Sequence, residues 1–248
     1  LMKMKILVVG GGGREHAIVW KIAQSPKVDK IYCAPGNGGI AELAECVDIA
    51  ATDIENMVKF AKDNAIDLVM VAPDDPLVLG MVDAMEKEGI RAFGPRANAA
   101  IIEGSKAFSK ELMKKYNIPT ANYEVFTDST SAIDYIKAQN TFPTVIKADG
   151  LALGKGVIIA QNLEEAEQAV HEMIDDGKFG KSGSRVVIEE FLTGPEVSVL
   201  AFTDGKTVKP MVSAQDHKRA YDNDEGLNTG GMGTFSPSRL YDDAKAEE

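Results

Sequence analysis

At 248 residues the chain exceeds one average domain, and its hydrophobic share of 44% is enough for sizeable cores, so we expect two or more structural units. Its net charge of −11, spread without a block of like charge, argues against nucleic acid or an anionic membrane as a main partner. The two cysteines form no C-x-x-C pair and no apolar run reaches ~18 residues, which argues against disulfide scaffolds, zinc sites and membrane-spanning helices and predicts a soluble, cytoplasmic protein.

The chain opens with a buried-strand pattern over residues 5–9, then four glycines, then helical spacing over residues 14–23. A glycine turn between a strand and a helix directs N–H groups and the helix dipole at one point, so it predicts a site for a phosphate or a carboxylate. The turn and its first helical residues are Gly10, Gly11, Gly12, Gly13, Arg14 and Glu15. His16 follows, where a helix-start residue is a commoner interpretation than a catalyst.

This glycine turn does not match a dinucleotide-binding fingerprint. Read from Gly10, the G-x-G-x-x-G pattern meets Glu15 at its last glycine, and read from Gly11 it meets His16. The next predicted strand, residues 30–34, ends without an acidic residue that could hold an adenosine ribose. The pattern therefore argues against NAD binding.

Strands and helices continue to alternate with short loops, which predicts a doubly wound parallel sheet. Ligands of such sheets lie at the carboxyl ends of the strands, where the glycine turn, Asn37 and Asp75 fall. Asp74 and Asp75 precede a predicted helix, so they either cap it or contact a substrate amine or hydroxyl. The elements expected here are a helix at 54–64, a strand at 67–71, a helix at 77–88 and a strand at 90–95.

The helix predicted at 105–116 ends at Asn117-Ile118-Pro119, which indicates a domain boundary. Beyond it the pattern predicts strands at 123–126, 144–148, 157–160 and 185–192, with helices at 129–139 and 163–174. We therefore expect a substrate-binding α/β domain at 1–104 and a connecting helix and linker at 105–120. A small subdomain at 121–192 and the start of a larger subdomain at 193–248 would follow.

The turn after the strand at 144–148 carries the strongest chemical signal. Gly150, Gly154 and Gly156 surround Lys155, and Lys147 lies within the preceding strand. Glycines let several N–H groups point at one ligand, and two lysines supply the positive charge that a polyphosphate needs. A hairpin with a loose loop is the plain alternative, but a lone lysine buried in a strand is costly. We interpret the stretch as a flexible flap over nucleotide phosphates.

Acidic and polar residues follow the later strands. Glu189 and Glu190 are either a solvated strand end or part of a hinge whose main chain contacts an adenine edge. Strands are expected at 196–203 and 208–214, with the polar run 215–219 at a strand end and a second glycine loop at 228–233. Residues 241–248 read as a helix start with nothing to pack against, so we expect a truncated chain.

Taken in order, these motifs resemble the phosphoribosylamine–glycine ligases (glycinamide ribonucleotide synthetases) of the ATP-grasp superfamily, over essentially the whole chain. Each short motif is weak alone, and the ordered set is specific. The motifs are Gly-Gly-Gly-Arg-Glu-His at 11–16, Ala-Pro-Gly-Asn at 34–37, Pro-Leu-Val at 76–78, Lys-Ala-Asp-Gly-Leu-Ala at 147–152, Gly-Lys-Gly-Val at 154–157, Glu-Glu-Phe-Leu at 189–192, Gln-Asp-His-Lys-Arg at 215–219 and Asn-Thr-Gly-Gly-Met-Gly at 228–233.

The chain departs from the family pattern in three places. Asp75 stands where the family has a glutamate, so the acid has a shorter reach, and Leu153 replaces a small flap residue. The family's metal-binding Glu-x-Asn would lie beyond residue 248. We therefore expect no metal ligands within this chain and little or no turnover from it.

The resemblance implies a pre-ATP-grasp domain followed by a truncated ATP-grasp α+β domain. It implies ATP-dependent ligation of glycine to 5-phosphoribosylamine through glycyl phosphate, giving glycinamide ribonucleotide, ADP and phosphate in purine biosynthesis. ATP and Mg²⁺ (or Mn²⁺) would be the cofactors, and the protein would be a monomer. Phosphoryl transfer of this kind needs alignment and charge neutralisation more than a covalent catalyst.

The resemblance also assigns roles to residues. Lys106 and Lys147 would contact phosphates, the main chain of Glu189 and Leu192 would hold adenine, and Glu196 would hold the ribose. The implied ATP-binding set is Lys106, Lys147, Gly150, Gly154, Lys155, Gly156, Glu189, Glu190, Phe191, Leu192 and Glu196. The implied catalytic set beside the γ-phosphate is Lys218, Asp216 and His217. The implied substrate-binding set is Gly11, Gly12, Gly13, Arg14, Glu15, Asn37, Gly38, Asp75, Asn228, Thr229, Gly230 and Gly231.

Two other function classes stay open at this point. An ATP-grasp enzyme could join another acid and amine, as carboxylating relatives do, although the motifs at 215–219 and 228–233 argue against it. The chain could also be a non-catalytic nucleotide-binding module. Competition by glycine analogues separates the first alternative from the ligase, and turnover separates the second.

Overall fold

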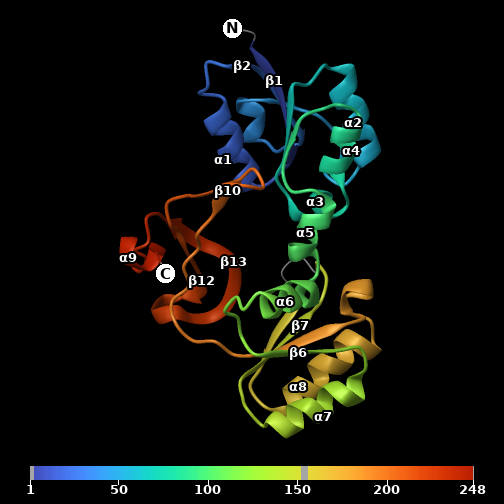
Figure 1. The fold of residues 1–248 in the computed structure, drawn as a ribbon, viewed down its shortest axis with the longest axis vertical. Helices are drawn as coiled ribbons and strands as arrows, with labels where there is room; N and C mark the ends of the chain where they lie inside the picture. The colour runs from blue at the N-terminus through green and yellow to red at the C-terminus, as the bar shows by residue number, and fades with distance from the viewer. Residues whose placement is uncertain (1–2, 152–155, 248) are drawn as a thin grey trace. The chain divides into compact units, whose positions relative to one another are not determined.

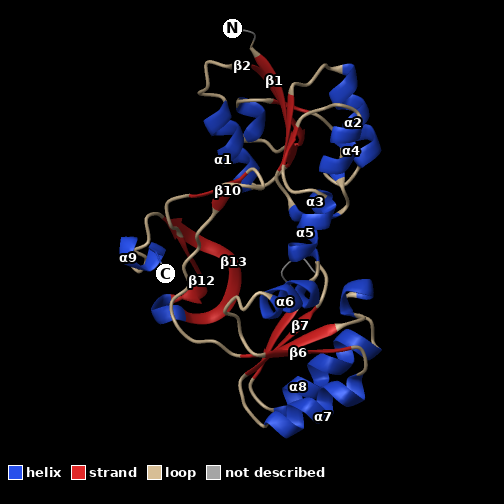
Figure 2. Ribbon diagram, viewed as in Figure 1, coloured by secondary structure: helices blue, strands red, loops and turns tan. Residues whose placement is uncertain are grey.

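The computed structural model describes residues 3–151 and 156–247, with Leu227, Asn228 and Gly230 described by their backbone alone. The chain divides into two compact units, Leu1–Phe191 and Leu192–Glu248. Helices alternate with strands along the first unit (Figures 1 and 2), so the predicted α/β class is confirmed. The finer four-part division expected from the sequence stays a prediction.

A parallel sheet forms the first part of the first unit, and within the described residues its strand order is β3-β2-β1-β4-β5. The central strand is the apolar run expected to be buried, with Leu7, Val8 and Val9 fully inaccessible to solvent. The strands are β1 (Met4–Gly10), β2 (Val28–Pro35), β3 (Glu45–Cys46), β4 (Leu68–Val71) and β5 (Ala92–Phe93).

Helices cover both faces of this sheet because alternate residues of β1 point to opposite sides. Ile6 and Val8 pack with α1 (Gly13–Ile22), whereas Leu7 and Val9 pack with α2 (Ile54–Asp63) and α4 (Met81–Lys87). Figure 2 shows α1 on one side of the sheet and α2 and α4 on the other. The predicted doubly wound sheet is therefore confirmed.

Three local expectations in this region are wrong. The helix expected at 77–88 is two helices, α3 (Asp74–Val78) and α4, because Gly80 between them has a left-handed φ of 92°. The strand expected at 90–95 is only Ala92–Phe93, since Gly94 has a φ of 146° and ends it. The helix α5 (Ala97–Gly104) was not expected, and its N-cap Arg96 makes no side-chain capping bond.

A second sheet is antiparallel, with the order β6-β9-β7-β8 among the described residues. Its elements, apart from the short 3-10 turn, which was not expected, lie within a few residues of their predicted positions. They are α6 (Lys106–Lys115), β6 (Tyr123–Phe126), α7 (Ser129–Gln139), β7 (Thr144–Ala148), β8 (Val157–Ala160), α8 (Leu163–Val170), a π-helical turn (His171–Asp175), a 3-10 turn (Gly180–Gly183) and β9 (Val186–Glu190).

Only one face of this sheet packs against α7 and α8 (Figure 1). Ile146 of β7 and Ile188 of β9 lie in that core and are fully buried. Because side chains alternate along a strand, Lys147 and Glu189 belong to the opposite face. Helix α6 contacts β9, and three of the predicted site residues, Lys106, Lys147 and Glu189, thereby come together.

The second unit consists mainly of two hairpins. The first pairs β10 (Ala201–Thr203) with β11 (Val208–Pro210), and both strands are shorter than expected. The second pairs β12 (Gln215–Tyr221) with β13 (Glu225–Phe235), and a short helix, α9 (Asp243–Glu247), follows.

The second hairpin corrects two expectations. The polar run 215–219 forms a strand rather than following one, and the glycine-rich run 228–233 lies within β13 rather than in a loop. Asn223 and Asp224 reverse the chain with left-handed φ values of 61° and 58°, so the glycine-rich segment pairs with β12 and gains ladder hydrogen bonds. Across the described part of the chain, no helix combines the length and apolar character needed to cross a membrane.

Candidate functional site

A cavity of about 240 Å³ lies between α6 and the open face of the second sheet. Among the residues that the structure describes, its walls hold the ammonium groups of Lys106, Lys110 and Lys147 and the carboxylates of Glu103 and Glu189. Two of the lysines come from α6 and one from β7, while Glu189 comes from β9. Three cations that face one cavity form a site suited to a polyanion.

Glu189 is the centre of this cluster. Its side chain is only 7% exposed, and its two carboxylate oxygens contact different lysines. One oxygen pairs with Lys147, and the other lies 2.6 Å from Nζ of Lys110. The lysine that would be costly as a lone charge in a strand is therefore paired, and Glu189 is not a solvated strand end.

Lys106 lies in the same cavity, and its Nζ makes no ion pair with a carboxylate in the part of the chain that the structure describes. Its Nζ donates to the carbonyl oxygen of Gly150 at 3.0 Å, at the base of the predicted flap. Burial, and next the repulsion from Lys147, lower the pKa of Lys106 below its usual range. The proximity of two ammonium groups is unfavourable in the free protein, and an anion between them would relieve it.

The position of Lys106 is fixed by a buried network at the start of α6. Asp149 accepts from the backbone N–H of Ala107 at 2.7 Å and from the hydroxyl of Ser105 at 3.1 Å. Nε of Arg185 donates to the same carboxylate at 2.9 Å. Ser105 in turn caps α6 by accepting from the N–H of Phe108.

Sequence reasoning assigned no role to Asp149, Ser105 or Arg185. Asp149 did carry a signal, because it directly precedes the glycine flap within the motif at 147–152. Arg185 carried none, since its contact with Asp149 joins residues 36 positions apart. The network links the N-terminus of α6 to the base of the flap.

One end of the flap is anchored to β7, and the other is anchored to the 3-10 turn at Gly180–Gly183. Gly156 accepts from the N–H of Ala148 at 2.8 Å, and Ser182 donates from its hydroxyl to the carbonyl of Leu151 at 3.1 Å. A Cβ on Gly150 would lie 2.5 Å from the Ser182 hydroxyl oxygen, so this position requires glycine. Gly154 and Lys155, which we predict to contact phosphates, lie outside the described residues.

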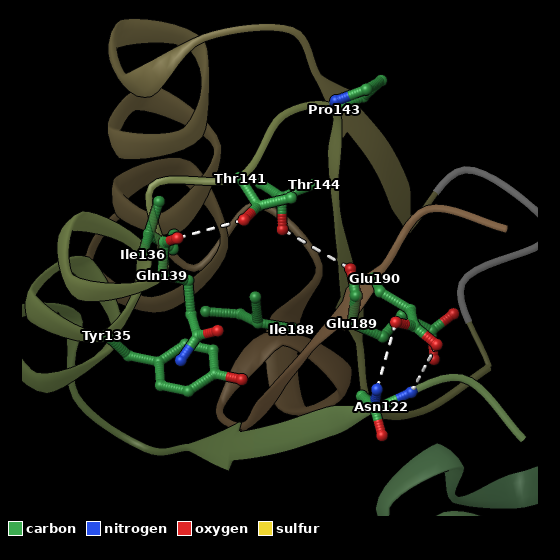
Figure 3. Close-up of a pocket in the computed structure, with 10 residues that line it drawn as sticks. All are labelled: Asn122, Tyr135, Ile136, Gln139, Thr141, Pro143, Thr144, Ile188, Glu189 and Glu190. Atoms are coloured by element: carbon green, nitrogen blue, oxygen red, sulfur yellow. Dashed lines mark hydrogen bonds between the residues drawn. The ribbon is translucent and has the colours of Figure 1, made fainter.

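A second cavity, of about 140 Å³, lies at the edge of the same sheet (Figure 3). At one end Asn122 donates its backbone and side-chain N–H groups to the carboxylate of Glu190, each at 3.1 Å. Thr144 donates to the carbonyl oxygen of Glu189 at 3.4 Å. Among the described residues no lysine lines this cavity, so it lacks the positive charge of the first one.

The remaining residues of the predicted hinge are more exposed. Phe191 is partly buried, and the side chain of Leu192 is 64% exposed. The carbonyl of Glu189, which we predict to contact adenine, already accepts the Thr144 hydroxyl. The same carbonyl belongs to the antiparallel ladder between β9 and β7, where Glu189 stands opposite Val145.

The second unit brings together predicted residues that were assigned to different parts of the ligand. Nζ of Lys218 lies 2.5 Å from Glu196 and 3.5 Å from Asp216. The hydrogen bond with Glu196 is the main reason that the pKa of Lys218 is raised. His217, the neighbour of Lys218 in β12, is exposed.

The glycine-rich strand β13 contacts the same segment. Thr229 donates its hydroxyl to the carbonyl of Lys218 at 2.8 Å and accepts from the N–H of Gly231 at 3.1 Å. Asn228 pairs with Arg219 in the register of the hairpin. The side chain of Asn228 lies outside what the structure describes, and Gly230 is described by its backbone alone.

The first glycine turn is held by residues 36–37, which directly follow β2. Asn37 donates its amide to the carbonyl of Gly11 at 2.9 Å, and a Cβ on Gly11 would lie 2.6 Å from the carbonyl oxygen of Gly36. Close backbone approach thus explains glycine at position 11. The predicted substrate residues Gly11 and Asn37 are in direct contact.

Glu15 occupies part of the anion-binding end of α1. Its carboxylate is buried and accepts from the N–H of Gly12 at 2.6 Å, as in a capping box. Gly13, Arg14 and Gly38 are exposed around it. Asp75 is partly buried in the first turn of α3, and Pro73, two residues earlier, would lie 2.9 Å from a Cβ on Gly10.

Comparison with known proteins gives this arrangement a class and then a family. The model of the phosphoribosylglycinamide synthetase N domain matches residues 4–103, and that of the phosphoribosylglycinamide synthetase ATP-grasp (A) domain matches residues 104–248. The fold is therefore of the ATP-grasp class. The chain belongs to the phosphoribosylglycinamide synthetase family, and the family resemblance inferred from the motifs is confirmed.

Individual relatives agree with this assignment. Phosphoribosylamine–glycine ligase of Halalkalibacterium halodurans is 54% identical over 245 residues, covering 99% of this chain and 57% of that protein. The enzyme of the same name from Haemophilus influenzae is 55% identical, covering 95% of this chain and 55% of that protein. The chain thus spans little more than half the length of the relatives it matches.

Solved structures share the fold. The crystal structure of phosphoribosylamine–glycine ligase from Thermotoga maritima superposes with a TM-score of 0.77 at 32% identity, covering 94% of this chain and 56% of that one. The biotin carboxylase domain of 2-oxoglutarate carboxylase from Hydrogenobacter thermophilus, a complex with MgADP, gives a TM-score of 0.76 at 19% identity over all of this chain and 56% of its own. At that identity the second match concerns the fold alone.

Proposed function

We propose that this chain carries the nucleotide and phosphoribosylamine sites of a phosphoribosylamine–glycine ligase. The reaction is the ATP-dependent joining of glycine to 5-phosphoribosylamine through glycyl phosphate, with release of ADP and phosphate. The observation that carries the proposal is the cavity with three lysines around the buried Glu189, at the base of a glycine flap, in a chain of this family. The protein would act in the cytoplasm, as a monomer.

In this proposal Lys106 and Lys147 neutralise the nucleotide phosphates, and the flap from Gly150 to Gly156 closes over them. Neutralisation lowers the repulsion between the phosphate oxygens and the incoming carboxylate, and closure excludes water that would compete as acceptor. The main chain at Glu189 and Leu192 holds the adenine edge. The pKa of Lys106 is lowered in the free protein, which fits a lysine whose charged form is stabilised when an anion binds.

The second unit contributes the polar groups for the acyl phosphate. Lys218 exchanges its contact with Glu196 for the γ-phosphate, while Glu196 turns to the ribose hydroxyls. Both side chains are more than 40% exposed, so the exchange costs little desolvation. Asp216, His217 and the glycine-rich segment at 228–231 border the glycine carboxylate.

The first glycine turn holds the phosphoribosylamine. The helix dipole and the N–H groups at the start of α1 favour its phosphate, and Arg14 adds a positive charge. The ribose or the amine is contacted at the same end of the sheet by Asn37, Gly38 and Asp75.

Magnesium stands apart from these assignments. ATP-dependent ligases of this class use a divalent cation to offset phosphate charge. In the described part of the chain, no three His, Cys, Asp or Glu side chains gather in a way that could hold a metal ion. We assign no metal ligand to these residues and derive no step through the ion.

The test is ADP release by the protein expressed to the stop codon of its gene, with ATP and magnesium. Glycine and freshly generated phosphoribosylamine are added singly and then together. ADP formation only with both substrates supports the ligase. No ADP from a folded protein that binds ATP points instead to an ATP-grasp ligase with another acid or amine. Residues 1–248 alone should show little or no turnover, and robust turnover would contradict that expectation.

A further inference from the structure

Lys110 is a buried lysine to which neither the motifs nor the proposed chemistry gives a role. Its side chain is 12% exposed, and Nζ lies 2.6 Å from Glu189 and 2.7 Å from the hydroxyl of Thr120. The same Nζ lies 3.4 Å from the carbonyl of Ala121 and 5.6 Å from the ring centre of Tyr123. An ion pair, two hydrogen bonds and a cation–π contact thus surround this ammonium group, so Lys110 is fixed in place.

Lys147 has the opposite character, although it shares the same carboxylate. Its side chain is 27% exposed, and Glu189 is its carboxylate partner among the described residues. It belongs to the cavity wall together with Lys106, whose pKa it lowers by repulsion. Of the two lysines on Glu189, Lys147 is therefore the one that is able to leave.

We propose that Lys110 is a positioning residue that keeps Lys147 available to an incoming polyphosphate by holding the carboxylate of Glu189. The inference rests on the proposed nucleotide function of the cavity. When Lys147 turns to a phosphate, Glu189 remains neutralised by Lys110. Without Lys110, the same movement would leave a buried carboxylate unpaired, so Glu189 would retain Lys147.

The first test measures the availability of Lys147 without nucleotide. Trace acylation of the intact protein, followed by peptide mass spectrometry, gives the labelling rate of each lysine. Lys110→Met should slow the labelling of Lys147 by about tenfold, because the carboxylate then binds a single ammonium more tightly. Adding Glu189→Gln to that variant should restore the labelling rate of Lys147. Lys110→Arg alone should leave that rate as in the parent protein.

The second test measures MgADP binding by calorimetry in the protein expressed to its stop codon. Lys110→Met should weaken binding by about tenfold in the parent protein but by less than twofold in the Glu189→Gln background. Lys114→Met is the matched control, since Lys114 is an exposed lysine on the same helix, and it should change neither readout. Thermal melting confirms folding, and Lys110→Gln replaces the methionine variant if that one does not fold.

The outcomes are distinct. A Lys147 labelling rate that does not respond to Lys110→Met, or an equal loss of affinity in both backgrounds, overturns the inference and leaves Lys110 a structural anchor of the segment at 120–121. The expected labelling pattern in a protein that binds no MgADP supports the control of Lys147 by Lys110 and overturns the proposed nucleotide function.

Discussion

The two units each contain a lysine–glutamate contact among the predicted nucleotide residues, and the two contacts differ in burial. In the first unit Lys147 contacts Glu189, whose side chain is 7% exposed and which also contacts Lys110. In the second unit Lys218 contacts Glu196, and the side chains are 42% and 59% exposed. The first contact is part of a packed interior, and the second lies at the surface of a hairpin.

Because of this difference in burial, the two lysines are held differently before a ligand binds. A buried carboxylate has already lost its hydration, so leaving it without a partner is costly. An exposed pair is screened by water and contributes little, so its members can exchange partners freely. We therefore expect substitutions near Glu189 to affect stability and binding together, and substitutions near Glu196 to affect function alone.

The largest expected effect is that of Lys147→Ala on nucleotide binding. The loss of a charge-assisted contact to phosphate should weaken MgATP binding by roughly 10- to 100-fold in calorimetry. Folding should be destabilised as well, but only modestly, because Glu189 keeps Lys110 as its partner. Unchanged affinity would remove Lys147 from the phosphate site and make its pairing with Glu189 a purely structural contact.

The second effect concerns stability and compares a buried with an exposed aspartate. Asp149→Ala removes the acceptor for Ala107, Ser105 and Arg185, which should lower the free energy of unfolding by about 2–4 kcal/mol in urea. Asp128→Ala, the matched control, removes an exposed cap whose carboxylate accepts from Ser131 at the start of α7. Its loss should be clearly smaller, and equal losses would mean that the Asp149 network is no stronger than an ordinary cap.

The third effect is a pH dependence at Lys106. Its pKa is lowered by burial and by Lys147, so the folded protein binds fewer protons than the unfolded chain between that pKa and the ordinary lysine value. In this alkaline window the contribution of Lys106 to folding stability rises with pH, while nucleotide affinity falls as the charge is lost. Labelling across a pH series should show that Lys106 becomes reactive at a lower pH than an exposed lysine does. Lys147→Met should move that response upward, and an unshifted response would show that Lys147 does not act on Lys106.

Local signals made most of the first unit predictable. Continuous apolar runs identified β1 and β9, and side-chain caps at Ser105, Asp128 and Asn162 stand where the sequence predicted helix starts. The misplaced elements of the second unit depend on pairing at a distance. A run such as Asn228–Gly233 has the composition of a loop, and only the partner strand β12 makes it a strand.

The site was predictable only in part, for the same reason. A lysine in a strand before a glycine turn predicts a phosphate contact, so Lys147 could be found from local sequence. Its partner could not, because Glu189 is a diagonal neighbour fixed by the antiparallel register, in which Val145 lies opposite Glu189 and Lys147 opposite Val187. Lys110 needed, in addition, the packing of α6 against β9.

The smallest expected effect on stability concerns the exposed contact between Lys218 and Glu196. Lys218→Met should change the free energy of unfolding by about 0.5 kcal/mol or less, because its contact with Glu196 is exposed to water. In the protein expressed to its stop codon, the same variant should nevertheless lose most ADP release in the presence of both substrates. Lys209→Met, a replacement of an exposed lysine in β11, is the control for stability and should retain activity. A large loss of stability with Lys218→Met would show that exposure does not separate the two contacts, since the surface pair would then stabilise the fold as the buried one does.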